Sequence, residues 1–219
     1  MLFTSAQNSK AANFIHELST LHFEATFNPY SEICPLHDLP NAPHIRRCNL
    51  ALVLDAAIAK GVDSMWIARD LGFRGGRRTG LALTDDIHLA DHAKLFNIPL
   101  LSSATKEPVM AERTATVIWN ALKIINKPIF LWNIFPLHPY QLGNPMSNRC
   151  HTRLEKNTCL PLLLWIIETL QPNRVIAIGK DAYSALNILS VKSVPVRHPS
   201  YGGQSLFYKG VAEEYGVCW

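Results

Sequence analysis

The chain has 219 residues, 48% of them hydrophobic, which suffices to bury the core of one domain. Its net charge of +4 permits a polyanionic partner but does not require one. The five cysteines are odd in number and include no CxxC pair, which argues against a disulfide framework or a CxxC zinc site. The composition therefore favours a globular protein with reduced thiols in a cytoplasm.

Two features of the sequence lead us to expect neither secretion nor insertion into a membrane. The N-terminal stretch "MLFTSAQNSK" lacks a basic start followed by a sustained apolar region, so no secretory signal is expected. The longest apolar run, at 160–167, is far shorter than the roughly 20 residues that span a bilayer. We expect no membrane contact, and we expect a monomer.

Strand and helix patterns alternate along the chain. In chain order they predict a helix at 11–23, a proline-broken loop at 28–44, a helix at 47–60, a strand at 65–68, helices at 84–96 and 108–126, a strand at 128–133, a helix at 153–171, a strand at 174–179, a helix at 180–190 and a strand at 193–198. This alternation predicts a three-layer α/β/α sandwich with a central, mainly parallel four-stranded sheet. We expect one domain over 1–219, with an N-terminal helix and loop at 1–46 and a core at 60–208.

Polar residues follow several of the predicted strands. Asp70 comes after the first, Asn133 ends the second, and His198 comes after the last. Because the carboxyl ends of parallel strands meet at one edge of a sheet, we expect these three side chains at one ligand site. A basic, glycine-rich loop, "GFRGGRRTG" at 72–80, follows Asp70 and is expected to approach a ligand closely.

These segments resemble the motifs of the uracil-DNA glycosylase superfamily. The stretch 68–84, "ARDLGFRGGRRTGLALT", aligns without a gap on the first catalytic motif, and Asp70 falls on its water-activating aspartate. "FLWN", ending at Asn133, resembles the strand that carries the base-reading asparagine, and "HPS" at 198–200 resembles the second catalytic motif. The resemblance covers about residues 60–208 and implies the fold of that superfamily.

The resemblance also implies a chemistry. Asp70 would orient water and favour the cationic sugar, while His198 would donate a hydrogen bond to the departing base. Asn133, with Phe73 beside it, would read the edge of a flipped pyrimidine. The DNA contacts would come from the glycine-rich loop and the last strand end, namely Arg69, Arg74, Arg77, Arg78, Ser200 and Tyr201.

Three positions depart from the superfamily pattern. Gly72 stands where the main uracil enzymes carry a tyrosine that excludes substituents on carbon 5 of the pyrimidine, and Leu83 replaces a stacking phenylalanine. Gly202 replaces a wedging leucine, so Tyr201 is the better candidate to fill the vacated stack. The cysteine ligands of the iron–sulfur relatives are mostly missing, and we expect no metal or other cofactor.

The sequence thus predicts a monofunctional DNA glycosylase that leaves an abasic site. The smaller residues Gly72 and Leu83 favour a bulky C5-modified cytosine, such as the glucosylated 5-hydroxymethylcytosine of phage DNA, and hence phage defence. Two alternatives remain within the superfamily: a repair enzyme acting on uracil or another damaged base, and a non-catalytic DNA-binding module. A nucleotide-binding enzyme is disfavoured, because the loop has neither a Walker lysine arrangement nor G-x-G-x-x-G.

Overall fold

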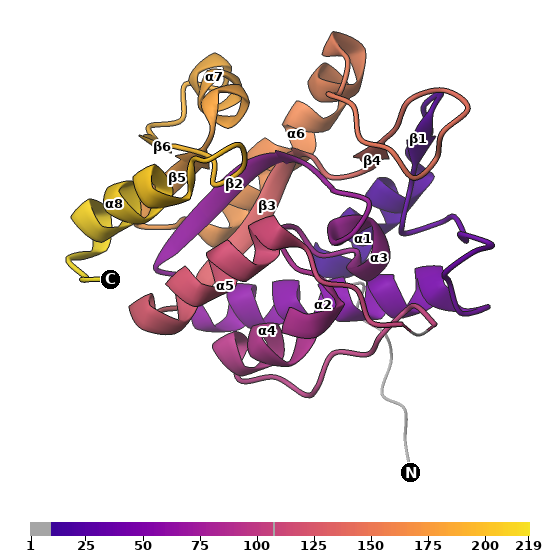
Figure 1. Ribbon diagram of the computed structural model, residues 1–219, viewed down its shortest axis with the longest axis horizontal. Helices are drawn as coiled ribbons and strands as arrows, with labels where there is room; N and C mark the ends of the chain where they lie inside the picture. The colour runs from indigo at the N-terminus through magenta and orange to yellow at the C-terminus, as the bar shows by residue number, and fades with distance from the viewer. Residues whose placement is uncertain (1–9, 107) are drawn as a thin grey trace.

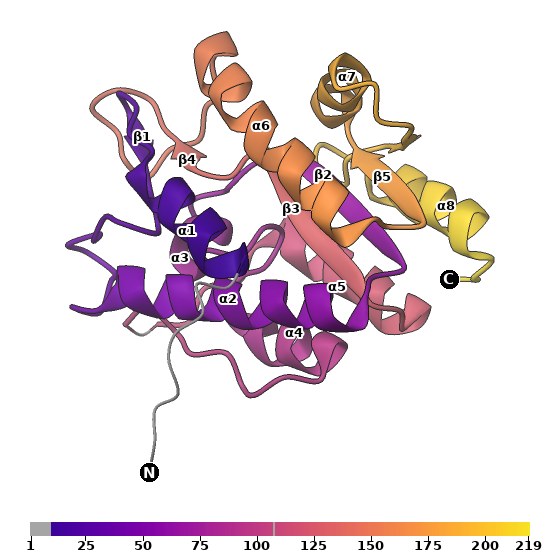
Figure 2. The ribbon, with the colours of Figure 1, turned by 180° about the vertical axis from the view of Figure 1, so that it is seen from behind.

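The computed structural model describes residues 10–106 and 108–219, so the stretch 1–9, where no secretory signal is expected, lies outside the described residues. Figures 1 and 2 show the chain from opposite sides. Its elements are α1 (Lys10–Thr20), β1 (Thr26–Phe27), α2 (Ala42–Lys60), β2 (Ser64–Asp70), α3 (Gly76–Thr79), the 3-10 turn η1 (Asp86–His88), α4 (Leu89–Phe96), α5 (Arg113–Ile125), β3 (Ile129–Phe135), β4 (His138–Pro139), α6 (Arg153–Leu170), β5 (Arg174–Ile178), α7 (Lys180–Ile188), β6 (Val194–Val196) and α8 (Gln204–Tyr215).

The main sheet is parallel and has the strand order β3-β2-β5-β6. Side chains alternate along β2, so Met65 and Ile67 enter one core while Trp66 and Ala68 enter the other. Helices α1, α2, α4, α6 and α7 complete the first core, and α5 and α8 complete the second. Figure 2 shows α6 lying across β3 on the first face. The expected three-layer α/β/α sandwich is confirmed.

The apolar runs predicted the four strands to within about two residues, but several short elements were missed. Helix α8 carries only Phe207 and Val211 as buried residues, so its sequence has little helical periodicity. Helix α2 begins at Ala42 rather than near 47, because Pro43 occupies its first turn, where no backbone donor is needed. The ribbon of β1 and β4 is too short to carry a strand pattern.

The glycine-rich loop after β2 is not a flexible arm but contains the buried turn α3. Gly80 ends this turn in the left-handed region, at φ +72°, where a Cβ would press against the side chain of Arg46. Tyr30 donates a hydrogen bond of 2.7 Å from its hydroxyl to the carbonyl of Gly80. The glycines therefore permit close packing inside the protein.

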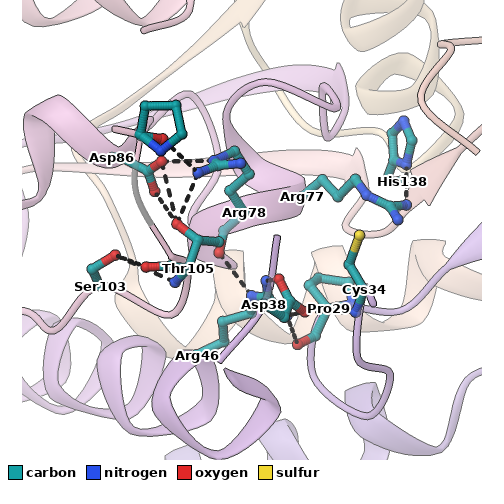
Figure 3. Close-up of polar contacts among 11 residues, drawn as sticks. Pro29, Cys34, Asp38, Arg46, Arg77, Arg78, Asp86, Ser103, Thr105 and His138 are labelled. Carbon is teal, nitrogen blue, oxygen red and sulfur yellow. Dashed lines mark hydrogen bonds and ion pairs between the residues drawn. The ribbon is translucent and has the colours of Figure 1, made fainter. Parts of the chain in front are cut away.

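The expectation that Arg77 and Arg78 hold DNA phosphates is wrong. They are only 4% and 3% exposed, and Figure 3 shows both side chains engaged by protein groups. The guanidinium of Arg78 pairs with Asp86 at 2.6 Å. Arg77 stacks 3.8 Å from the ring centroid of Phe27 and lies 3.0 Å from Nδ1 of His138, which fixes the ribbon of β1 and β4. Both arginines therefore stabilise the fold.

Replacing Arg78 by Met should lower the free energy of unfolding by about 3–5 kcal/mol, because Asp86 would be left as an unpaired buried charge. The measurement is equilibrium unfolding in urea. Arg74→Met, at an exposed position on the same loop, is the matched control and should change the free energy by less than about 0.5 kcal/mol. Equal effects of the two variants would contradict a structural role for Arg78.

Candidate active site

A cleft of about 890 Å³ opens at the carboxyl ends of β2, β5 and β6. It lies where the strand order reverses, since β2 connects to β3 on one side and borders β5 on the other. Ligands of parallel α/β sheets bind at such a switch point. Its lining includes the residues Ala68, Arg69, Asp70, Leu71, Gly72, Leu83, Glu112, Asn148, Gly179, Asp181, Arg197, His198, Ser200 and Tyr201.

The carboxylate of Asp70 is held between two side chains. Arg69 Nε lies 2.6 Å from one oxygen, and Nδ1 of His151 contacts the other. Arg69 also reaches Asp181 at 3.2 Å, so its guanidinium is shared between two carboxylates that line the cleft. The Asp70 side chain is only 6% exposed, and its orientation is therefore fixed by these partners. A carboxylate has about four acceptor positions, so acceptor capacity remains for a water molecule or a ligand.

His151 is a site residue that sequence reasoning missed. It immediately precedes the capping box of α6, in which Thr152 and Glu155 bond to each other's backbone N–H groups. Its ring packs 6.0 Å from that of Phe135, the last residue of β3. The capping box could have marked this turn as rigid, but nothing in the sequence connects it with Asp70.

The surroundings of His198 favour a neutral ring with one N–H donor. The backbone N–H of Ser200 donates to Nδ1 of His198 at 3.1 Å, so Nδ1 is unprotonated and the neutral ring carries its proton on Nε2. Burial, helped by the positive charges of Arg69 and Arg197, lowers the pKa of His198 to about 4. The ring is therefore uncharged at neutral pH, and Ser200 serves as its support.

Asn133 lies inside β3 rather than at its end. It pairs in register with Ala68, which lines the cleft, and it is only 1% exposed. Within the described part of the chain, neither its amide oxygen nor its amide nitrogen has a hydrogen-bond partner. An unpaired buried amide is costly, so a ligand that reached it would gain both a donor and an acceptor.

The space beside Gly72 is occupied, contrary to the expectation of an opening there. A Cβ placed at Gly72 would overlap Oε1 of Glu112, and one at Gly75 would overlap Oε2. Glu112 lines the cleft and is half-buried. Burial and the nearby charge of Asp85 raise the pKa of Glu112 to about 7, against the opposing effect of Arg74.

Tyr201 lines the cleft, and Phe73 and Arg74 follow the cleft residue Gly72 in sequence. Tyr201 is 97% exposed and has φ +51°, a conformation that costs a non-glycine residue about 1 kcal/mol or more. Gly202 follows it at φ +74°. The backbone N–H of Phe73 donates a hydrogen bond to the side chain of Asn148. The exposed guanidinium of Arg74 lies over the ring of Phe73, 5.2 Å from its centroid.

Across the described residues, no three His, Cys, Asp or Glu side chains are grouped to hold a metal ion. None of the helices that the structure describes is long and apolar enough to cross a membrane.

Replacing Glu112 by Gln should stabilise the protein at about pH 8 by about 1–2 kcal/mol, after allowance for its partial exposure. The pKa rises from 4.5 to about 7 on folding, so the folded state loses stability as pH increases through this interval. An uncharged amide removes that loss, and near pH 4 the variant should gain nothing. Thermal unfolding at both pH values measures the difference.

Glu168→Gln, at an exposed position on α6, is the control and should change the stability by less than about 0.5 kcal/mol at either pH. A pH-independent effect of Glu112→Gln would contradict the raised pKa.

The chain resembles the crystal structure of SMUG2 from Pedobacter heparinus, with a TM-score of 0.62, 14% identity, and coverage of 94% of this chain and 96% of that one. At this identity the likeness establishes the fold. A search of curated proteins gave no match. The model of the Uracil DNA glycosylase superfamily matches residues 76–211, more than half of the chain, including Asn133 and His198. The chain belongs to the Uracil DNA glycosylase superfamily and is therefore a DNA glycosylase, an enzyme that hydrolyses N-glycosyl bonds.

Proposed function

We propose that this enzyme flips a bulky C5-modified cytosine out of DNA and hydrolyses its N-glycosyl bond, leaving an abasic site. The observation that carries the catalytic part is that Asp70 and His198 line the same cleft at the carboxyl edge of the sheet. The substrate that we favour is glucosylated 5-hydroxymethylcytosine of phage DNA, so the biological role would be phage defence.

In this proposal Asp70 acts at the sugar. Breaking the bond leaves positive charge on the sugar and negative charge on the base, and a fixed carboxylate stabilises the first and orients water. Arg69 and His151 hold that carboxylate in place from two sides. Preorganisation of this kind avoids reorientation of the group during the reaction.

His198 acts at the departing base. Its Nε2–H donates a hydrogen bond to the base oxygen on which negative charge develops. The low pKa of His198 and the Ser200 N–H donor both support the neutral tautomer that this step uses. Asn133 would bind the Watson–Crick edge, and this role is supported by the two unpaired atoms of its buried amide.

The preference for a bulky base rests on the size and lining of the cleft. Its volume of about 890 Å³ is near the upper end of ligand sites, and Leu83 lines it where the superfamily motif carries an aromatic ring. The polar groups Glu112 and Asn148 line the same cleft and suit a hydroxylated substituent. Exposed Arg74 is the proposed phosphate contact.

Base release from a panel of DNA duplexes tests this function. Wild-type protein should release the glucosylated base, and Asp70→Asn should slow release by about 100- to 10,000-fold. The liberated base is identified by mass spectrometry, and abasic sites are scored by cleavage in alkali. Asp181→Asn, which removes the second partner of Arg69 without changing Asp70, is the matched control and should lose less than about tenfold.

Three other results of this experiment would each contradict a different part of the proposal. Release of uracil alone would identify a repair enzyme and defeat the proposed substrate. Binding of DNA without release of any base would contradict catalysis. An Asp70→Asn variant as active as the Asp181→Asn control would remove Asp70 from the mechanism.

Tyr201 is proposed to fill the gap that the flipped nucleotide leaves in the duplex. An aromatic ring that is almost fully exposed and held at positive φ has no role in the core, whereas stacking on a base is worth about 1–3 kcal/mol. Tyr201→Ala should therefore slow release from duplex DNA by about ten- to a hundredfold, and release from single-stranded DNA much less. Leu206→Ala, at another exposed apolar position on α8, should change neither rate. Equal loss on both DNA forms would rule out the wedge.

A further inference from the structure

Glu112 has a position that helix capping does not explain. It is the N-cap residue of α5, yet its side chain makes no capping hydrogen bond. Its carboxyl turns instead into the cleft and lies against the backbone of Gly72 and Gly75. Burial, Asp85 and Arg74 account for the shifted pKa of this carboxyl, and within the described part of the chain no hydrogen bond to it contributes.

The backbone of Glu112 is fixed even though its carboxyl is unengaged. Its N–H donates to Oδ2 of Asp85 at 2.7 Å, and Oδ1 of Asp85 is held by the ring of His88 at 2.5 Å. The half-buried carboxyl has its pKa raised to about 7, so retaining it costs stability at neutral pH. A destabilising group that is anchored and faces a ligand cleft is typical of a functional residue.

We propose that Glu112 determines base specificity by accepting hydrogen bonds from donors on the base, namely the exocyclic amine of cytosine and the hydroxyl groups of a substituent on C5. This inference rests on the proposed function, in which the base lies in the cleft beside Gly72. The enzyme would then select its base by hydrogen-bond donors in addition to the size of the cleft.

The chemistry distinguishes the candidate bases. Uracil presents a carbonyl where cytosine presents an amine, and a carbonyl oxygen facing a carboxylate gains no hydrogen bond and is repelled. A glucosylated hydroxymethyl group carries several O–H donors, each of which can satisfy a carboxylate oxygen. Glu112 accepts best when it is ionised. Burial and Asp85 hold its pKa at about 7 against the effect of Arg74, so the ionised form predominates above neutral pH, and release is therefore compared at about pH 8.

The location of Glu112 also changes the meaning of substitutions at Gly72. A side chain introduced at Gly72 would have to displace the Glu112 carboxyl, because the two would occupy the same space. A bulky residue there would therefore remove the acceptor as well as narrow the cleft. Direct replacement of Glu112 separates these effects.

The test compares single-turnover release by wild type, Glu112→Gln and Glu112→Ala from two duplexes, one with glucosylated 5-hydroxymethylcytosine and one with uracil. On the modified cytosine, Glu112→Ala should be slower by about ten- to a hundredfold, the effect of losing a hydrogen bond to a charged acceptor. Glu112→Gln keeps an amide oxygen that accepts but loses the charge, so it should be slower by about fivefold. On uracil, their rates should stay the same or rise. Glu168→Gln should match wild type on both.

The inference and the proposed function fail differently. If wild type releases the modified cytosine and Glu112→Gln does so within about twofold, the inference is wrong while the function stands. The same loss on both bases would also overturn it, since Glu112 would then support the cleft in general. If wild type releases no modified cytosine, the proposed substrate fails and the inference fails with it. Thermal unfolding of Glu112→Gln, which should be at least as stable as wild type, shows that a lost rate is not lost folding.

Discussion

The buried ion pair between Arg78 and Asp86 is the constraint on which the arrangement of the site depends. It joins the turn after β2 to η1, and Arg46 from α2 donates to the carbonyl of Arg78 at 2.8 Å. Arg46 is itself paired with buried Asp38, so two desolvated ion pairs lie side by side (Figure 3). Buried pairs of this kind contribute little net stability compared with apolar packing, but breaking one leaves an uncompensated charge. Here the two ion pairs restrict the loop at 72–80 to one backbone conformation.

The same network of polar contacts extends to the cleft. Asp85, next to the ion-paired Asp86, binds the backbone N–H of Glu112 and so sets where α5 begins. The segment between them also supplies Thr105, whose hydroxyl accepts from Arg78 at 3.0 Å. This network therefore fixes the position of Glu112 at the cleft. Asp70 is held separately, by Arg69 and His151.

The sequence predicted the sheet and its functional edge because both follow from local pattern. Short apolar runs identified the strands, and the polar residue after each run identified the edge, which brought Asp70 and His198 to the same cleft. The direction of the arginine side chains could not be predicted in this way. A loop rich in glycine and arginine has the same pattern whether its charges face solvent or a buried carboxylate. Only the positions of Asp86 and Phe27, distant or unpatterned in sequence, decided that Arg78 and Arg77 turn inward.

Two site residues escaped prediction for a related reason. His151 and Glu112 both lie just before a helix, in segments without hydrophobic periodicity, and each reaches the site through tertiary packing. Asn133 was expected at the end of its strand but lies inside β3, because the apolar residues after it continue the strand. Motifs specify residues that act on every substrate of a family. Residues that adapt the site to one substrate carry no such pattern.

In the proposed role of Glu112, the exchange at Gly72 would replace selection by size with selection by hydrogen bonding. A tyrosine at that position would exclude substituents by size, since an aromatic ring is rigid and accepts little variation. A carboxyl at the end of a flexible side chain can move, so it restricts size weakly and selects by hydrogen bonding instead. The carboxyl is supplied by a separate segment that is anchored through Asp85 and not through β2. Substrate preference can therefore change through the loop that precedes α5 while Asp70, His151 and His198 keep their geometry.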